Sequence, residues 1–444
     1  MNWHKGFFYH LFPLGCFDAP HGNDHQPASR IRRIEPWLDH MAELGVDVLL
    51  LGPVFESETH GYDVTNYFMP DSRLGTDEDF AWMCGEAHRR DIRVVFDGVF
   101  NHVGRSFWAF QDVLRNGDQS RFLPWFHITF GKGSPLGDPF SYKAWRGHDE
   151  LVTLNTDCPE VRGHLFHAVA EWIARYNIDG VRLDSADCLD FGFQHALADH
   201  CRRLKPEFYC LGEVIHGDYP RWLTEGGLDA VTNYIQHKGL WSAHNDANYF
   251  ELAHTCARQF EQAETMRSLY AFADNHDVTR IADRLKNPAH LYPLHILLFT
   301  LPGAPSVYYG SECGIGGIKK KGQPDWPIRP PLTPESMREV GRHPDLEKTI
   351  ARLACLRRNC KSLWDGDFRN LAIASRQYAF LRAKDGETSA VLVNAAANAA
   401  ALAVSGIPAG MYRDILNEED VSVPSGTASI MIPPCWGRIL VKKE

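Results

Sequence analysis

Four short segments constrain the fold of this 444-residue chain most, because each ends an apolar run with an acid or a histidine. They are Asp97–His102 (DGVFNH), Gly180–Asp184 (GVRLD), Leu211–Val214 (LGEV) and Phe272–Asp277 (FADNHD). The apolar runs have the length and the β-rich composition of strands that are buried on both faces. In a closed parallel barrel the carboxyl ends of the strands converge on one face, so these side chains are predicted to share a pocket.

Strands and helices are predicted to alternate along most of the chain. Strand-like runs lie near residues 7–14, 46–54, 92–100, 180–184, 208–214, 229–234, 268–275 and 297–309. The clearest helical pattern between them covers residues 159–177, with one apolar face. That face holds Val161, Leu165, Val169, Trp172, Ile173 and Tyr176. Eight such units predict a (β/α)8 barrel rather than an open doubly wound sheet, and no GxGxxG follows the first run.

Two regions break the alternation. Residues 103–150 are rich in glycine, proline and aromatic residues without a helical period, which predicts an irregular excursion between the third strand and its helix. After about residue 365, short alternating runs separated by turn residues predict an antiparallel β-sandwich. The predicted domains are therefore a barrel (1–102 and 151–362), the excursion (103–150) and a C-terminal sandwich (363–444).

Charge and cysteine content narrow the classes of function. A net charge of −10 without a basic block argues against a nucleic-acid partner. No apolar run reaches 18 residues, so a membrane partner is not expected either. The eleven cysteines are scattered without a CxxC pair, which predicts no zinc site and no disulfide framework, and fits a cytoplasmic location. The first fifteen residues are interpreted as the start of a strand rather than as a secretory signal. The oligomeric state stays open.

Three carboxylates from three strand ends are the arrangement that glycoside hydrolysis needs. A retaining mechanism requires a nucleophilic carboxylate about 5–5.5 Å from a carboxylic acid across the scissile bond. Arg182 precedes Asp184 by two residues, so both side chains point the same way, and the guanidinium is predicted to lower the pKa of Asp184. Glu213 has no cation next to it in the sequence, so burial is expected to keep it protonated, as an acid catalyst requires.

These segments, in this order, resemble the signature regions of glycoside hydrolase family 13, the α-amylase superfamily. Gly61–Tyr67, Leu151–Arg162 and Gly303–Ile315 resemble three further motifs of the family, although Val152 and Thr153 replace a usual Pro-Asp. The matches run from about residue 7 to 332. The resemblance implies a (β/α)8 barrel with the excursion as its domain B.

The resemblance also implies roles for individual residues. Asp184 is assigned as nucleophile, Glu213 as general acid/base and Asp277 as the third catalytic carboxylate. Six residues are assigned to substrate binding: Tyr62, His102, Arg182, His276, Asp325 and Arg329. Asp97 is assigned to orienting its neighbours from behind them.

Two departures from the family pattern bear on cofactors and subfamily. Many extracellular α-amylases have a Lys-His pair shortly after the nucleophile that helps to complete a calcium site, but Asp187 and Cys188 stand there. Asn101, another ligand in calcium-dependent members, is present, but calcium needs several hard oxygen ligands. We therefore expect no cofactor and no structural calcium. In lacking this pair, the chain resembles intracellular members that act on maltodextrins and cyclomaltodextrins. Those members usually carry an N-terminal β-domain before the barrel.

The expected activity is retaining hydrolysis of α-1,4-glucosidic bonds in maltooligosaccharides or related soluble α-glucans, through a covalent glycosyl-enzyme. One alternative is 4-α-glucanotransfer or another transglycosylation on the same intermediate, because both reactions use the same carboxylates. A remote alternative is a non-catalytic relative, such as the barrel-bearing heavy chains of amino-acid transporters, which have lost their catalytic acids. Linkage, chain length, and linear or cyclic substrate stay open.

Overall fold

A closed barrel of eight parallel strands forms the centre of the protein. The computed structural model describes residues 3–261, 268–424 and 427–443. Neighbouring strands follow the order β1-β15-β14-β13-β12-β11-β5-β2, and β1 pairs with β2 to close the ring. The strands are β1 (Phe8–Leu11), β2 (Val48–Leu51), β5 (Arg93–Gly98), β11 (Gly180–Leu183), β12 (Tyr209–Gly212), β13 (Ala230–Thr232), β14 (Leu269–Phe272) and β15 (Ala304–Tyr308). The predicted barrel is confirmed.

Apolar side chains fill the barrel interior. Because side chains alternate along a strand, Phe8 points inward while Tyr9 points outward toward the helices. The interior cluster consists of Phe8, Val48, Leu50, Val95, Tyr209, Leu211, Ala230, Tyr270, Phe272 and Ala304. The barrel is therefore a packed core, and its chemistry is confined to the end where the strands finish.

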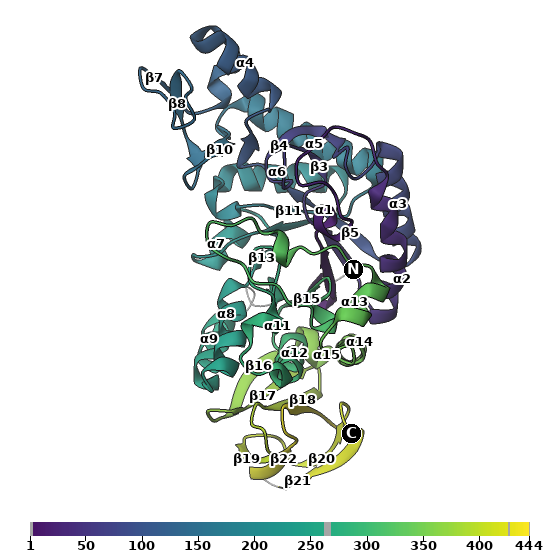
Figure 1. Ribbon diagram of the computed structural model, residues 1–444. Helices are drawn as coiled ribbons and strands as arrows, with labels where there is room; N and C mark the ends of the chain where they lie inside the picture. Colours follow the sequence, from purple (N-terminus) through teal and green to yellow (C-terminus); the bar gives the residue numbers. More distant parts are fainter. Residues whose placement is uncertain (1–2, 262–267, 425–426, 444) are drawn as a thin grey trace.

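The helices lie outside the barrel (Figure 1). They include α2 (Glu35–Leu44), α3 (Asp77–Arg89), α5 (Pro159–Tyr176), α6 (Phe191–Leu204), α7 (Tyr219–Thr224), α8 (Tyr234–Asn245), α9 (Tyr249–Glu261), α12 (Leu291–Thr300) and α14 (Leu346–Asn359). Helix α3 begins at a capping box in which Thr76 and Asp79 satisfy each other's backbone N–H groups. Helix α5 matches the predicted helix, with Val161 and Trp172 buried on its inner face. None of the described helices combines the length and apolarity needed to cross a bilayer.

Two strand boundaries differ from the prediction. The run 7–14 stops being a strand at Leu11, because Pro13 starts the short helix α1 (Pro13–Cys16). The run 297–309 joined two elements, since Leu297–Thr300 are the end of α12 and β15 begins at Ala304. An uninterrupted apolar run cannot by itself distinguish a buried helix from a buried strand. A further hairpin, β3 (Phe55–Ser57) with β4 (Val64–Pro70), follows β2 and was not predicted.

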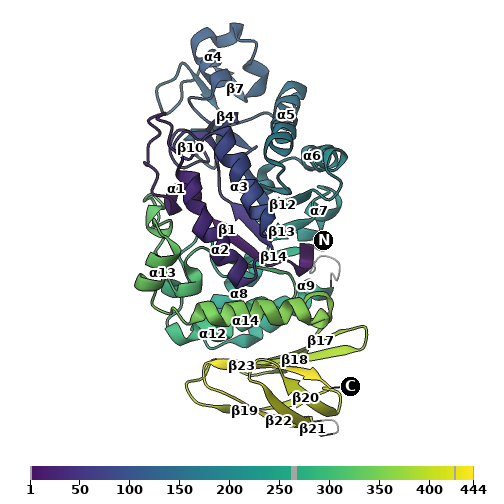
Figure 2. The same ribbon diagram turned by 90° about the vertical axis from the view of Figure 1, so that its right-hand side faces the viewer.

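The excursion after β5 is more regular than the sequence indicated. It contains β6 (His102–Gly104), α4 (Trp108–Asn116), β7 (Ile128–Phe130), β8 (Phe140–Tyr142), β9 (Ala144–Trp145) and β10 (His148–Thr153). Strands β6, β10 and β9 form one antiparallel sheet. The prediction of no helix there was wrong, because α4 is a single amphipathic segment that buries only Ala109, Phe110 and Val113. Figure 2 places the excursion at the opposite end of the barrel from the C-terminal strands.

Two antiparallel sheets form the C-terminal part, as predicted. The larger sheet orders β16 (Asp367–Ile373), β17 (Gln377–Lys384), β18 (Glu387–Asn394), β23 (Trp436–Lys442), β20 (Gly410–Asp414) and β21 (Glu419–Val423), and the smaller sheet pairs β19 (Ala400–Ser405) with β22 (Thr427–Ile432). Apolar side chains from both sheets, including Leu392, Val404 and Ile430, form one cluster. Strands β20 and β21 were missed, because exposed polar residues such as Asp420 hide their alternation.

A buried arginine joins this sandwich to the barrel. Arg382 on β17 is 1% exposed. Its guanidinium donates to the carbonyl of Thr300 at the end of α12 (2.7 Å), and to those of Gly366 (2.9 Å) and Asp367 (3.2 Å). One side chain thereby satisfies backbone acceptors on both sides of the junction.

Candidate active site

The ends of neighbouring strands bring the predicted site residues together. Asp97 on β5 and Arg182 on β11 are register partners, and Leu183 pairs with Gly212 on β12. Asp184 and Glu213 follow β11 and β12 directly. Two consecutive strand ends therefore present two carboxyl groups at the same level of the barrel mouth.

Arg182 lies among three carboxyl groups and is 3% exposed. Its Nη1 is 2.6 Å from both oxygens of Asp97 and 3.5 Å from Asp184 Oδ1. Its Nη2 is 2.9 Å from Glu213 Oε1. One guanidinium thus serves three acids, and Asp97 holds it most closely.

Arg182 acts to lower the pKa of Asp184, as expected, but two other effects outweigh it. Burial first, and the neighbouring Glu213 carboxylate second, raise the pKa of Asp184 well above its ordinary value, although Arg182 acts to lower it. Burial also raises the pKa of Asp97, against Arg182. Asp184 and Glu213 interact strongly, so their carboxyl groups titrate together. The proton that is kept at raised pH is therefore shared by the two groups. Asp184 Oδ2 has no hydrogen-bond partner in the described part of the chain.

Glu213 forms an ion pair with Arg182 and accepts two hydrogen bonds. Besides Arg182, the phenol of Tyr234 donates to Oε1 (3.1 Å) and the backbone N–H of Ser185 donates to Oε2 (3.0 Å). Glu213 has no cation next to it in the sequence, but Arg182 reaches it from the adjacent strand. Ser185 has a left-handed backbone (φ 48°), which a non-glycine residue adopts at a cost of order 1 kcal/mol, and this turn carries the N–H that meets Glu213.

Asp277 is surrounded by cations and is 32% exposed. His276 Nε2 lies 3.0 Å from its Oδ2, Arg329 Nη2 lies 3.1 Å from its Oδ1, and Lys319 Nζ lies 4.0 Å from the same oxygen. Burial acts to raise the pKa of Asp277, but His276, Arg329 and Lys319 together outweigh it and hold the pKa well below its usual range. Asp277 is therefore an anion at neutral pH.

Tyr62 contacts both Asp97 and His276. Its hydroxyl donates to Asp97 Oδ2 (3.0 Å) and contacts His276 Nε2. The ring of His276 is stacked between those of Tyr62 (5.4 Å) and Phe12 (5.7 Å). This packing fixes the imidazole beside Asp277.

His102 lies on the excursion side of the site. It is 1% exposed, and burial lowers its pKa to about 3, so the imidazole is neutral. A backbone group of Tyr62 hydrogen-bonds the ring, whereas Nε2 has no partner among the described residues. The indole of Trp145 on β9 lies beside it, with ring centroids 5.4 Å apart.

Asp325 and Arg329 join the site through one ion-pair network. Arg329 Nη2 donates to Asp325 Oδ2 (3.3 Å) as well as to Asp277, and Lys319 Nζ lies 3.0 Å from Asp325 Oδ2. Lys319 lies in an exposed loop and still contacts the site through this ion pair. The sequence carries no signal for this contact, since loop geometry alone creates it.

Sequence reasoning missed Tyr234, Asn275 and His10. Tyr234 follows the end of β13, and the rule that found the other strand-end groups applies to it as well. Asn275 Nδ2 donates to the Tyr234 hydroxyl (3.1 Å). His10 lies on β1, one residue before its end, with its ring centroid 5.0 Å from that of His276.

The turn after Asp184 bears on the calcium prediction. Asp187 Oδ2 accepts from Arg146 Nη2 at 3.0 Å, and Arg146 belongs to the β9–β10 hairpin. Asn101 Nδ2 lies 3.2 Å from His102 Nδ1, and its carbonyl accepts from Leu154 N–H. A guanidinium at the position of an expected ligand does not fit a calcium shell. The absence of calcium stays a prediction.

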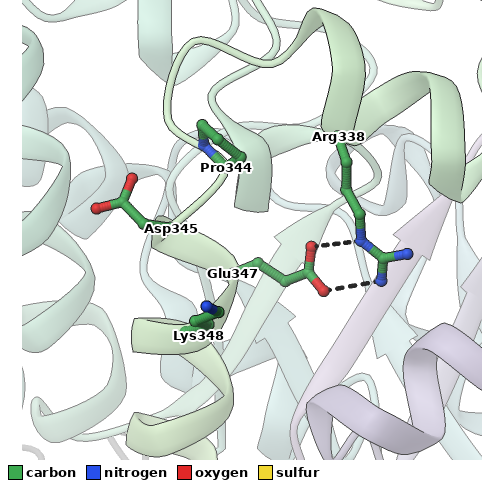
Figure 3. A pocket seen from close by; sticks show the side chains of 5 residues that line it. All are labelled: Arg338, Pro344, Asp345, Glu347 and Lys348. Carbon is green, nitrogen blue, oxygen red and sulfur yellow. Dashed lines mark hydrogen bonds and ion pairs between the residues drawn. The ribbon is translucent and has the colours of Figure 1, made fainter.

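A surface hollow of about 330 Å3 lies elsewhere (Figure 3). Arg338 of α13 (Pro334–Val340) and Glu347 of α14 form a two-point ion pair there, with distances of 2.8 and 2.9 Å. Pro344, Asp345 and Lys348 complete the lining. None of the strand-end groups described above contributes to it.

Comparisons with known proteins agree with the geometry. The family model described as the alpha amylase catalytic domain matches residues 31–351. A cyclomaltodextrinase of Geobacillus thermopakistaniensis (strain MAS1) is 30% identical over 421 residues, which cover 92% of this chain and 69% of that protein. An intracellular maltogenic amylase of Bacillus subtilis (strain 168) is 32% identical over 287 residues, 63% of this chain and 48% of that protein. The chain thus spans about half to two thirds of the length of these relatives.

A solved structure matches from end to end. The ligand-free cyclic α-maltosyl-(1→6)-maltose hydrolase of Arthrobacter globiformis has a TM-score of 0.85 and 26% sequence identity, and each chain is covered to 100%.

Proposed function

The chain belongs to the α-amylase family, as its motifs predicted, and we propose that it is a retaining glycosidase that hydrolyses α-1,4-glucosidic bonds in short soluble α-glucans. One observation carries the proposal: Asp184, Glu213 and Asp277 end three strands of one barrel, with Arg182 among the acids. The names of the relatives, cyclomaltodextrinase and maltogenic amylase, support this substrate class.

The chemistry takes two steps. Glu213 gives its proton to the glycosidic oxygen while Asp184 Oδ2 attacks the anomeric carbon, so that the sugar–oxygen bond breaks and a glycosyl ester forms. Water then attacks the same carbon, its proton passes to Glu213, and the ester bond to Asp184 breaks. Asp277 stays anionic and binds sugar hydroxyls, and the neutral His102 and the constrained His276 hold the same ring. The chain's own residues supply every group that these steps need.

The Arthrobacter match favours a particular substrate within this class. That structure has no segment beyond the length of the present chain, and its name specifies a cyclic tetrasaccharide. We therefore include cyclic α-maltosyl-(1→6)-maltose beside linear and cyclic maltodextrins as a candidate substrate. One relative is named as intracellular, which supports action inside the cell.

A substrate panel tests the proposal. Purified protein is incubated with maltotriose, maltoheptaose, a cyclomaltodextrin, cyclic α-maltosyl-(1→6)-maltose, pullulan and starch, and the products are followed by chromatography and by NMR of the new anomeric centre. We expect short or cyclic substrates to be hydrolysed fastest, with the α configuration retained. Products longer than maltotriose would favour the transferase alternative. A first product of β configuration, or a folded protein inactive on every substrate, would contradict the proposal.

A further inference from the structure

Tyr234 contacts the carboxyl group assigned as acid/base. It begins α8, two residues after the end of β13, and its hydroxyl lies 3.1 Å from Glu213 Oε1. Its ring meets that of Phe272 edge to face, at 4.9 Å and 80°. The phenol is therefore held by a core side chain and is directed at the reacting group.

The network around Tyr234 fixes the direction of its hydrogen bond. The backbone N–H of Asp277 donates to Asn275 Oδ1 (2.8 Å), which identifies the oxygen end of that amide. The amide nitrogen must then donate to the Tyr234 oxygen, at 3.1 Å. Because the phenol oxygen accepts from Asn275, its single proton is free to be donated to Glu213.

The phenol keeps that proton at any pH at which the enzyme works. Burial first, and then the carboxylates of Glu213 and Asp277, raise the pKa of Tyr234 well above its ordinary value. Tyr234 is therefore a permanent donor and takes no part in acid–base exchange.

We propose that Tyr234 is a positioning residue that stabilises the carboxylate which Glu213 becomes when it gives up its proton. The inference rests on the proposed function, since it needs Glu213 to act as acid and then as base. In the first step Glu213 changes from neutral acid to anion, so a donor on Oε1 is worth more in the transition state than before it. In the second step Glu213 starts as the anion and takes a proton from water, so the same donor stabilises the starting state.

Other groups also face Glu213, but none can be removed as cleanly. Arg182 also forms ion pairs with Asp97 and Asp184, so replacing it would disturb all three acids. The Ser185 donor is a backbone N–H, which a side-chain substitution does not remove. Tyr234→Phe removes one oxygen and keeps the ring that packs on Phe272.

The test compares two leaving groups. With maltotriose, which needs proton donation, we expect kcat/KM of Tyr234→Phe to fall by about 10-fold to 100-fold, the range for hydrogen bonds to charged groups. With α-maltosyl fluoride, whose fluoride departs without a proton, we expect little change. The basic limb of the kcat/KM pH profile with maltotriose should move to higher pH, because the anionic form of the acid loses a donor.

Tyr270→Phe is the matched control. Tyr270 lies inside the barrel on β14, and its hydroxyl bonds Ser306 Oγ at 2.6 Å without contacting Glu213. This variant loses one buried phenol hydrogen bond and should keep the wild-type ratio between the two substrates. If Tyr234→Phe folds poorly, 3-fluorotyrosine at position 234 keeps the ring and strengthens the donor, so the basic limb should move to lower pH.

Two results would overturn the inference. One is an equal loss of kcat/KM on both substrates in Tyr234→Phe, and the other is an unchanged pH profile in both Tyr234→Phe and the 3-fluorotyrosine variant. Failure of the proposed function itself looks different, because the wild-type protein would then be inactive on maltotriose and on the fluoride alike.

Discussion

Arg182 lies closer to Glu213 than to Asp184, with Nη2 2.9 Å from Glu213 Oε1. The contact between Arg182 and Asp184 is longer, at 3.5 Å. Burial first, and the neighbouring Glu213 second, outweigh this longer contact and raise the pKa of Asp184. A substrate that contacts Asp184 or Glu213 therefore enters a site in which one proton is shared by two carboxyl groups.

Asp184→Asn should abolish turnover without unfolding the protein. An amide cannot form the glycosyl ester, so kcat is expected to fall by at least about 10⁴-fold. Initial rates with maltotriose, together with circular dichroism, check this. Asp199→Asn on the exposed face of α6 is the control and should retain normal activity. Near-normal activity in a folded Asp184→Asn protein would rule out this residue as nucleophile.

The same substitution should stabilise the protein as pH rises. The folded pKa of Asp184 is raised, whereas the unfolded chain loses this proton near pH 4, so ionisation costs stability above that pH. Asparagine does not titrate and escapes the cost. We expect the melting temperature of Asp184→Asn to exceed that of the wild type at pH 7.5 and the difference to shrink toward pH 4.5. A difference that does not grow with pH would contradict the burial argument.

Glu213→Gln separates the acid and base roles. Maltooligosaccharides should slow by roughly 10²–10⁴-fold, because the proton donor is gone. A maltosyl fluoride should still form the glycosyl-enzyme on Asp184, which then accumulates for want of a base. Azide needs no deprotonation, so it should restore turnover and give an α-glycosyl azide. Equal losses on both substrates without azide rescue would remove Glu213 from the acid/base role.

EDTA should leave activity and melting temperature nearly unchanged. The guanidinium of Arg146 pairs with Asp187, and Asp187 and Cys188 replace the Lys-His pair that helps to complete the family's calcium site. A bound ion present at 100 times its Kd would stabilise the fold by about 2.7 kcal/mol, so its removal would be visible in calorimetry. A melting temperature that rises with added calcium after EDTA treatment would overturn this expectation.

The sequence predicted the barrel and its strand-end acids because both depend on local patterns. A short apolar run followed by Asp or Glu is the pattern of a buried parallel strand with an acid at its end. It can be recognised without reference to the rest of the chain. Contacts between strands were harder to predict. Arg182 was paired with Asp184 by spacing alone, whereas the register of β11 against β5 gives its closest contact to Asp97.

Residues on loops could not be placed from the sequence. Lys319 reaches Asp325 through the geometry of a single loop. Tyr234 reaches Glu213 because the barrel brings the ends of β12 and β13 to one rim. Helix α4 was missed for a different reason: it spans 9 residues, too few for its period to stand out among aromatic neighbours.

The hydrogen bonds of Arg382 couple the stability of the sandwich to that of the barrel. Deleting the chain from residue 363 onward would remove Arg382. The buried carbonyl of Thr300, at the end of α12, would then lose this hydrogen-bond donor. The C-terminal strands therefore do not behave as a detachable module. Heating should melt barrel and sandwich in one cooperative calorimetric transition, and a shortened chain should lose the barrel with them.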